Sequence, residues 1–266
     1  HIAYYIDFLV EEGYAYSTIM REQYVGVGAV LRWAYREGKV SESVMERIER
    51  QTIKSRAREA MTDTEKKNEN SPPPHLSKDK VYEVAESVGA PKDRNSLLVK
   101  LLFWTGIRAS EAELIEWDDI NLDEPSIRIY SPKTDTSRTV SYPASELNPE
   151  LRDWWYNGRL RYKAADESER LFIGLRGPIT THWINKIVRE AATESGHQTE
   201  ARTTKAGNTR SEATSHLLRH SHAMHYLNHT DTELEAISQH LGHSSVSTTE
   251  QFYAQSTKDR IVREFS

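Results

Sequence analysis

The feature that most constrains the fold is a polar segment that divides the chain. Residues 62–74 read TDTEKKNENSPPP, contain no large apolar side chain and end in three prolines. Such a segment is too polar to be buried, and its prolines stiffen it. The sequence therefore predicts a domain of residues 1–61 and a second domain of residues 75–266, joined by a linker. Because the chain begins at His1 and not at a methionine, we expect the first domain to be truncated at its N-terminus.

Apolar spacing predicts a small all-helical unit before this linker. Residues 1–12 place apolar side chains at helical intervals, and Gly13 follows as a stop. Residues 17–37 form a longer periodic segment that ends at Gly38, and Ser41 begins a third helix. The side chains that we expect to face inward from these last two helices are Ile19, Val27, Val30, Leu31, Ala34, Val44, Met45 and Ile48.

The second unit is predicted to be mainly helical with a small antiparallel β-sheet. Residues 126–130 and 138–142 alternate in polarity and are joined by a polar turn, which is typical of a β-hairpin. Two S/T-x-x-E capping boxes, at Thr230 and Ser247, predict two late helices. The other predicted elements are helices over 77–88, 96–104, 110–117, 179–196 and 214–228 and a short strand over 171–174.

Composition excludes several classes of protein. The chain has no cysteine, which excludes a disulfide framework, thiolate catalysis and cysteine-ligated zinc. It contains no apolar run of about 18 residues and no leader, so we expect no membrane span and a cytoplasmic location. The formal net charge of −5 argues against a nucleic-acid partner, although one local positive surface would be enough for such a partner.

A histidine-rich segment, residues 215–243, is the densest cluster of reactive side chains. The pairs His216/His220 and His225/His229 are spaced to share a helical face, as zinc ligands can be. Neither pair encloses the glutamate of an H-E-x-x-H motif, and a third ligand has no defined place. We therefore expect no metal, and we interpret His222, His225 and His229 as surface or core residues of a helix.

One side of the same segment favours an anion instead. His216 and Arg219 are three residues apart and would be neighbours on a helix, where both can donate hydrogen bonds to anionic oxygen. Arg108, in TGIRASEAEL, stands at a predicted helix start, which also favours anions. The alternative is that Arg108 forms a surface salt bridge with Glu111 or Glu113.

Five segments together resemble one known family. They are TGIRASE at 105–111, the hairpin Lys133 followed by Arg138, Val140 and Pro143, HLLRHSHA at 216–223, LGH at 241–243 and TTEQFYA at 248–254. In order and spacing they are similar to the signature boxes of the tyrosine recombinases, the phage integrase family. Residues 1–61 resemble that family's helical core-binding domain, so the similarity covers nearly the whole chain and implies a catalytic domain over 75–266.

The resemblance implies a set of catalytic residues: Arg108, Lys133, His216, Arg219, His243 and Tyr253. The tyrosine would attack a DNA phosphorus to give a 3′-phosphotyrosine, and the arginines would bind the non-bridging oxygens. The histidines would donate hydrogen bonds or assist proton transfer, and the lysine would protonate the leaving 5′-oxygen. Neither metal nor ATP would be needed, because guanidinium groups replace the metal and the covalent intermediate conserves bond energy.

Two of these assignments have alternatives. Many relatives place the nucleophile nine residues after the LGH histidine, which is Phe252 here, whereas Tyr253 stands at ten; relatives with ten also occur, so we choose Tyr253. For Lys133 the alternative is an exposed turn lysine, and we choose the catalytic role.

Double-stranded DNA is the partner that the resemblance implies, bound by a homotetramer on two paired sites that passes through a Holliday junction. The polar segment 196–211 would be a DNA-facing loop or a solvated insertion. The alternatives are a topoisomerase of type IB and a catalytically silent DNA-binding protein of the same fold. The basic side chains expected to contact DNA are Arg47, Arg50, Lys54, Arg56, Arg58, Arg138, Arg202, Lys205 and Arg210.

Overall fold

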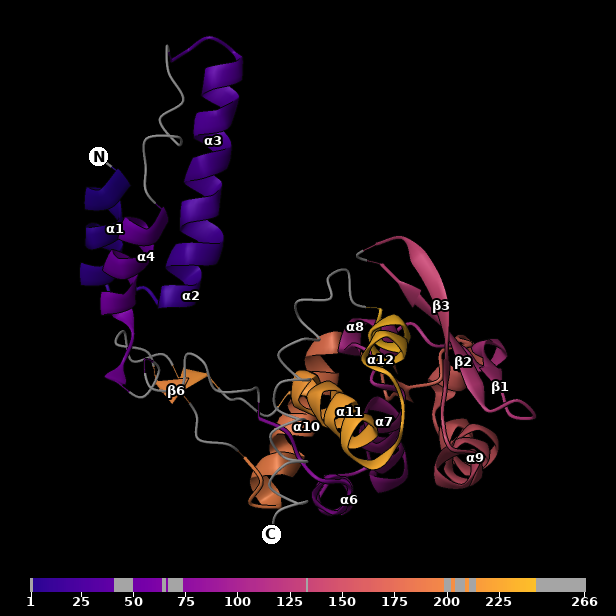
Figure 1. Cartoon of the computed structure of the whole chain (residues 1–266). Helices are drawn as coiled ribbons and strands as arrows, with labels where there is room; N and C mark the ends of the chain where they lie inside the picture. Colours follow the sequence, from indigo (N-terminus) through magenta and orange to yellow (C-terminus); the bar gives the residue numbers. More distant parts are fainter. Residues whose placement is uncertain are drawn as a thin grey trace. The chain divides into compact units, whose positions relative to one another are not determined.

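A computed structural model describes most of the chain, as two compact units (Figure 1). One unit comprises His1–Ser71 with Ala201–Arg210, and the other comprises Pro72–Glu200 with Ser211–Ser266. The described residues are 2–40, 50–63, 66, 74–132, 134–198, 202–203, 209–210 and 214–242, with the backbone alone for 202–203 and 209–210.

The described part of residues 1–61, in the first unit, is helical, as predicted. Its small core is built where α1 and α4 pack on each other and on the π-helical turn η1. The buried residues of this core are Ile6, Leu9, Ile19, Ile53, Ala57 and Ala60. Its elements are α1 (Ile2–Glu11), α2 (Tyr16–Thr18), η1 (Ile19–Gln23), α3 (Tyr24–Arg36), α4 (Arg50–Ala57) and η2 (Arg58–Ala60).

The inward face predicted for residues 17–37 is only partly observed. Ile19 is fully buried, but Val30 is 62% exposed and Leu31 and Ala34 are half-buried. Among the elements that the structure describes, α1 and α4 contact this helical run at η1, where Ile19 lies. The expected side chains Val44, Met45 and Ile48 lie outside the described residues.

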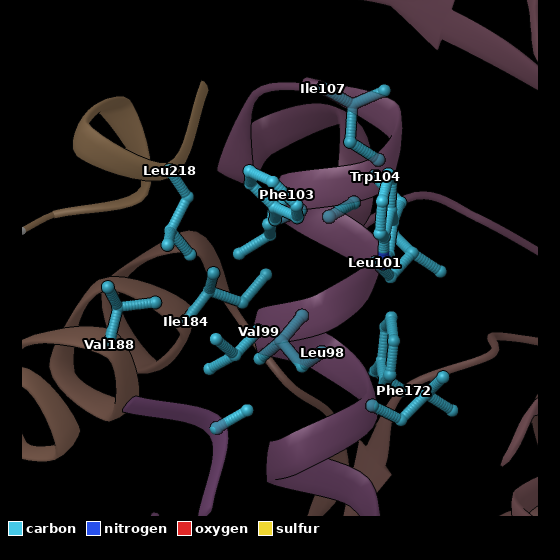
Figure 2. Close-up of a cluster of buried hydrophobic side chains, with 14 of the residues drawn as sticks. Leu98, Val99, Leu101, Phe103, Trp104, Ile107, Phe172, Ile184, Val188 and Leu218 are labelled. Carbon is cyan, nitrogen blue, oxygen red and sulfur yellow. The ribbon is translucent and has the colours of Figure 1, made fainter. Parts of the chain in front are cut away.

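The second unit is organised around α7 (Lys92–Thr105), whose residues from Leu97 to Thr105 are buried on nearly every side, which makes this helix central. Helices α6 (Lys78–Glu86), α9 (Ala144–Asp153), α10 (Thr181–Glu194) and α11 (Ser215–His229) all pack against it. Figure 2 shows Phe103 and Val99 of α7 facing Ile184 of α10 and Leu218 of α11. The α7 helix ends at Gly106 in the left-handed conformation, φ 62°, which turns the chain into the candidate site.

The hairpin is present as predicted and belongs to a three-stranded antiparallel sheet. Its strands are β1 (Ile120–Asn121), β2 (Ser126–Ser131) and β3 (Thr136–Ser141), in that order. Ile127 and Ile129 of β2 and Val140 of β3 are buried on one face. Helix α12 (Leu234–Leu241) packs against β3 (Figure 1).

The helix predicted over 110–117 is wrong beyond its first turn. The observed helix, α8, covers only Ala109–Ala112, and a 3-10 turn, η3, follows at Trp117–Asp119. Between them the chain turns to backbone pairing, since the Leu171 N–H donates to the Ile115 carbonyl at 2.8 Å. This tertiary pairing outweighs the local helical pattern.

The predicted start of α12 is wrong as well. Its N-cap is Glu233, three residues after the predicted capping residue Thr230. Thr230 instead ends α11, where its hydroxyl donates to the Tyr226 carbonyl at 2.7 Å. The box predicted at Ser247 lies outside the described residues.

Short elements complete the second unit. None of the helices that the structure describes is long and apolar enough to cross a membrane. The remaining elements of the second unit are η4 (Trp154–Gly158), η5 (Arg159–Arg161), η6 (Lys163–Asp166), β4 (Ile173–Gly174) and β5 (Gly177–Pro178). The first unit has one further pair of strands, β6 (Arg202–Thr203) and β7 (Thr209–Arg210).

Candidate active site

Arg219 is the buried anchor of the candidate site. It lies on α11, is only 5% exposed, and donates from Nη1 to the Gly106 carbonyl and from Nη2 to the Leu241 carbonyl, each at 2.7 Å. Burial, followed by the positive charge of Arg108, lowers its pKa to about 9. The guanidinium therefore has a fixed position between two turns of the chain. Its positive charge is only partly offset, by the negative charge of Glu111.

The close approach at Gly106 requires a glycine. Its φ of 62° lies in the left-handed region, and an added Cβ would lie 2.5 Å from Leu241 Cδ2 and 2.7 Å from His222 Cδ2. The glycine therefore allows the turn after α7 to lie directly against α11 and the end of α12. That contact places the Gly106 carbonyl within reach of Arg219.

Arg108 approaches the same point from the start of α8. As the N-cap, its backbone N–H donates to Glu111 Oε2 at 2.9 Å, and its Nη1 pairs with Glu111 Oε1 at 3.0 Å. Its Nη2 donates to the Gly242 carbonyl at 3.3 Å. Arg219 binds the preceding carbonyl, that of Leu241, so the structure brings the two predicted arginines together at consecutive residues of one turn.

The alternative salt bridge of Arg108 is observed with Glu111 and not Glu113, but it is not a surface pair, because the Glu111 side chain is fully buried. Glu113 accepts instead from the Thr181 backbone N–H and hydroxyl, at the start of α10. The Arg108 side chain is 29% exposed, so pairing with Glu111 does not enclose it.

Glu111 was expected only as a salt-bridge partner of Arg108, and the structure gives its carboxylate more partners in the candidate site. Its side chain is fully buried and accepts from Arg108, Arg138 and Ser131. Burial alone would raise its pKa, but the hydrogen bonds from Arg138 and Arg108 outweigh burial and lower the pKa to about 2. The signal available in the sequence was its place three residues after the N-cap, where a glutamate binds the cap N–H.

Arg138 was expected to contact DNA, and the structure gives it internal partners instead. Its Nη1 and Nη2 donate to the two oxygens of Glu111 at 2.9 Å each, and its Nε donates to the His240 carbonyl at 2.9 Å. The side chain is 17% exposed. Three of the five N–H groups of this guanidinium therefore bind protein atoms, and its observed partners are all internal.

His216 keeps an exposed side chain at the start of α11, near the arginines. Desolvation, followed by the positive charges of Arg219 and Arg108, lowers its pKa below the ordinary value. The adjacent Ser215 fixes this helix end, since its N–H and hydroxyl donate to Asn185 Oδ1 at 3.1 and 3.0 Å. The lowered pKa therefore favours the neutral form of this imidazole beside Arg219 and Arg108.

His222, His225 and His229 lie in the core or at the surface of α11, as interpreted from the sequence. His222 is buried on the Phe103 carbonyl at 2.8 Å and stacks on His240, with ring centroids 5.0 Å apart. His225 is half-buried, and His229 is exposed and stacks on it. Over the described ranges, no group of three or more His, Asp or Glu residues is arranged to hold a metal.

Several predicted residues lie where the structure gives no description. Lys133, His243, Tyr253 and Arg47 lie outside the described residues, as do Lys205 and the side chains of Arg202 and Arg210. Among the basic residues of the first unit, Arg50, Lys54 and Arg58 are exposed, whereas Arg56 forms an ion pair with Asp7.

The comparisons with known proteins identify the family. The sequence model of the phage integrase family matches residues 77–260. The chain belongs to the phage integrase family, the tyrosine recombinases. As a member of that family, it is 30% identical to tyrosine recombinase XerC of Pediococcus pentosaceus over 186 residues, 68% of this chain and 56% of that protein. It is 26% identical to XerC of Corynebacterium glutamicum over 98% of this chain and 75% of that protein. The integrase-family chain thus spans little more than half the length of the first of these relatives.

Solved structures of the phage integrase family show the same fold. A post-cleavage complex of the XerH recombinase with a palindromic difH substrate is 26% identical, with a TM-score of 0.59 over 74% of this chain and 54% of that one. The Tn1549 transposon integrase in complex with transposon right end DNA is 16% identical, with a TM-score of 0.72 over 99% of this chain and 84% of that one. A lambda integrase tetramer bound to a Holliday junction is 17% identical, with a TM-score of 0.65 over 94% and 63%. The last two likenesses concern the fold alone.

Proposed function

We propose that this chain is a site-specific tyrosine recombinase that cleaves and rejoins double-stranded DNA through a 3′-phosphotyrosyl intermediate. The single observation that carries the proposal is the convergence of Arg108 and Arg219 on the consecutive carbonyls of residues 242 and 241. Family membership and the relatives named tyrosine recombinases support it. We place the DNA-binding core-binding domain at 1–61, the catalytic domain at 75–266 and the linker at 62–74.

The two arginines would bind the scissile phosphate. Each guanidinium has more N–H groups than its bonds to protein oxygens use, so donors remain for the non-bridging oxygens. Because backbone carbonyls fix Arg219 and Glu111 fixes Arg108, these donors need no reorganisation as charge builds in the transition state. This positive charge does the work that Mg²⁺ does at other phosphoryl-transfer sites, so the proposed reaction uses neither metal nor ATP.

The covalent step would exchange one phosphoester bond for another. The Tyr253 oxygen attacks phosphorus, the bond from phosphorus to the 5′-oxygen breaks, and Lys133 gives that oxygen a proton. The phenolic proton passes to a base, for which the neutral His216 is suited, and His243 donates to the phosphate. Attack by a 5′-hydroxyl from another strand reverses the step and completes strand exchange.

Recombination of this kind involves two DNA sites. We propose a homotetramer on paired sites that passes through a Holliday junction, acting in the cytoplasm. The lambda integrase tetramer bound to a Holliday junction and the DNA complex of XerH support this assembly, since both share the fold. The proposed DNA contacts are the basic side chains Arg47, Arg50, Lys54, Arg56, Arg58, Arg202, Lys205 and Arg210 of the first unit.

Covalent capture of DNA tests the proposal. The whole chain is incubated in EDTA with a pool of nicked duplexes of random sequence, and SDS-resistant protein–DNA complexes are recovered and sequenced. We expect linkage with wild type and none with Tyr253→Phe. Linkage that persists in the Phe variant would mean that another residue is the nucleophile. Binding without linkage would favour the silent DNA-binding protein, and relaxation of a site-free plasmid by the monomer would favour the topoisomerase.

A further inference from the structure

The β2–β3 hairpin reaches the candidate site through one carboxylate. Ser131, at the end of β2, donates from its hydroxyl to Glu111 Oε1 at 3.0 Å, and Arg138 of β3 binds both Glu111 oxygens at 2.9 Å. Arg138 also binds the His240 carbonyl at 2.9 Å, and an added Cβ at Gly242 would lie 3.1 Å from its Cζ. One guanidinium therefore links the hairpin, α8 and the turn after α12.

Without Arg138, the two carboxylate oxygens of Glu111 would keep different hydrogen-bond donors. Oε1 would keep Arg108 Nη1 and the Ser131 hydroxyl, whereas Oε2 would keep only the backbone N–H of Arg108. A fully buried carboxylate with too few donors is costly, so it attracts the nearest cation. That cation is Arg108, which would then be drawn from the Gly242 carbonyl toward Glu111.

We propose that Arg138 is a positioning residue for strand cleavage. By saturating Glu111, it leaves the Arg108 guanidinium free to bind phosphate. The proposal rests on the proposed function. It differs from the phosphate contact first expected, because here Arg138 acts on the phosphate only through Glu111 and Arg108.

Two readouts separate a positioning residue from a DNA contact. The first is the single-turnover rate of covalent linkage at saturating protein, on a nicked duplex recovered from the random pool. The second is the dependence of affinity on salt, measured by anisotropy on a duplex of unrelated sequence. Loss of one phosphate contact reduces the slope of log affinity against log salt by about 0.9, whereas loss of a positioning residue leaves it unchanged.

We expect Arg138→Gln to lower the linkage rate by about 10- to 100-fold with the salt slope unchanged. Arg138→Lys should recover part of the rate, since a lysine restores charge but not the bidentate geometry. Arg128→Gln is the matched control, because Arg128 lies on the same hairpin, pairs with Asp119 and has a side chain 68% exposed. It should change neither readout.

Arg138→Gln alone leaves the buried charge of Glu111 without its main partner and can unfold the protein. The double variant Glu111→Gln/Arg138→Gln removes both charges of the pair together, so its linkage rate can be measured in that case. If Arg138 acts through Glu111, the double variant should cleave no more slowly than Glu111→Gln alone. A rate equal to the product of the two single losses overturns the proposal, and so does a reduced salt slope in Arg138→Gln or an unchanged cleavage rate. If the wild-type protein binds DNA but never becomes covalently linked, both the proposed recombinase function and this role of Arg138 are wrong. That outcome differs from one in which the wild type is linked and only the Arg138 variants behave unexpectedly.

Discussion

The same residue types are held very differently in the two units. On the described part of the first unit, Arg50 and Lys54 of α4 are exposed on the helix surface. In the second unit, Arg219 is 5% exposed and bound to two carbonyls, and Arg108 is bound to Glu111 and a third carbonyl. An exposed basic side chain on a helix surface can attract DNA without a fixed geometry. A guanidinium that is held by hydrogen bonds can instead be positioned on one phosphate oxygen. We therefore expect substitutions at the anchored arginines to change rates and substitutions on α4 to change affinity.

The largest effect is expected at Arg219. Arg219→Lys should lower the single-turnover rate of covalent linkage by about 100- to 1,000-fold, because an ammonium group cannot bind two carbonyls and a phosphate in the same plane. The affinity of this variant for a duplex of unrelated sequence should change by less than about threefold, because the lysine keeps the positive charge of the arginine. A variant that keeps the wild-type rate would show that Arg219 is structural only, and urea unfolding of the same sample checks that it is folded.

The next effect concerns stability and pH. The pKa of Glu111 is lowered from 4.5 to about 2, so its ionised form stabilises the fold by about 3 kcal/mol above pH 4.5. A lowered folded-state pKa gives stability that is lost as pH falls from about 4.5 through about 2. The free energy of unfolding of wild type should therefore exceed that of Glu111→Gln at neutral pH, and the difference should shrink over this range in urea titrations. A difference independent of pH would contradict the assignment of an ionised, hydrogen-bonded carboxylate.

On α4 we expect a change of affinity without a change of rate. Arg50→Gln/Lys54→Gln should reduce the salt slope of DNA binding by about 1 to 2 and weaken binding at low salt. The linkage rate at saturating protein should stay at the wild-type value. Lys80→Gln, an exposed lysine of α6, controls for the loss of net charge. If the salt slope of the α4 variant matches that of the control, α4 does not contact DNA.

The smallest effect is a shift in one titration. Arg108 is among the charges that lower the pKa of His216, after desolvation and Arg219. Removing that charge by Arg108→Gln should raise the His216 pKa, as followed by NMR of the imidazole C–H. Arg128→Gln should leave it unchanged. An unmoved pKa in Arg108→Gln would place Arg108 too far from His216 to act with it.

Local patterns predicted much of the fold, and tertiary pairing decided the rest. Local sequence predicted helices α7, α10 and α11 and the β2–β3 hairpin: α7 came from a nearly continuous apolar run, and the hairpin came from strand alternation. The helix after Arg108 stops early because Ile115 pairs with Leu171, a partner that no local pattern reveals. The start of α12 was misplaced because the Thr230 hydroxyl binds back to α11 and does not cap forward.

The site was predictable in its arginines but not in its connections. Arg108, Arg219 and His216 came from spacing and family resemblance, and the structure brings them together. The pairing of Arg138 with Glu111 spans 27 residues, and a surface arginine was the simpler expectation. Strand alternation did contain a clue, because Arg138 shares a face with Val140, which is fully buried. A basic residue on the same face of a strand as a buried valine indicates that its side chain has a partner inside the protein.

The central claim is that Arg108 and Arg219 act on one phosphate, and a double-mutant cycle on the rate of covalent linkage tests it most directly. Arg108→Gln, Arg219→Gln and the double variant are compared with wild type in single-turnover reactions on the same captured duplex. Two groups that hold one phosphate act as a unit, so the double variant should lose far less than the product of the single losses. A loss equal to that product would mean that the two arginines act independently and would contradict the account.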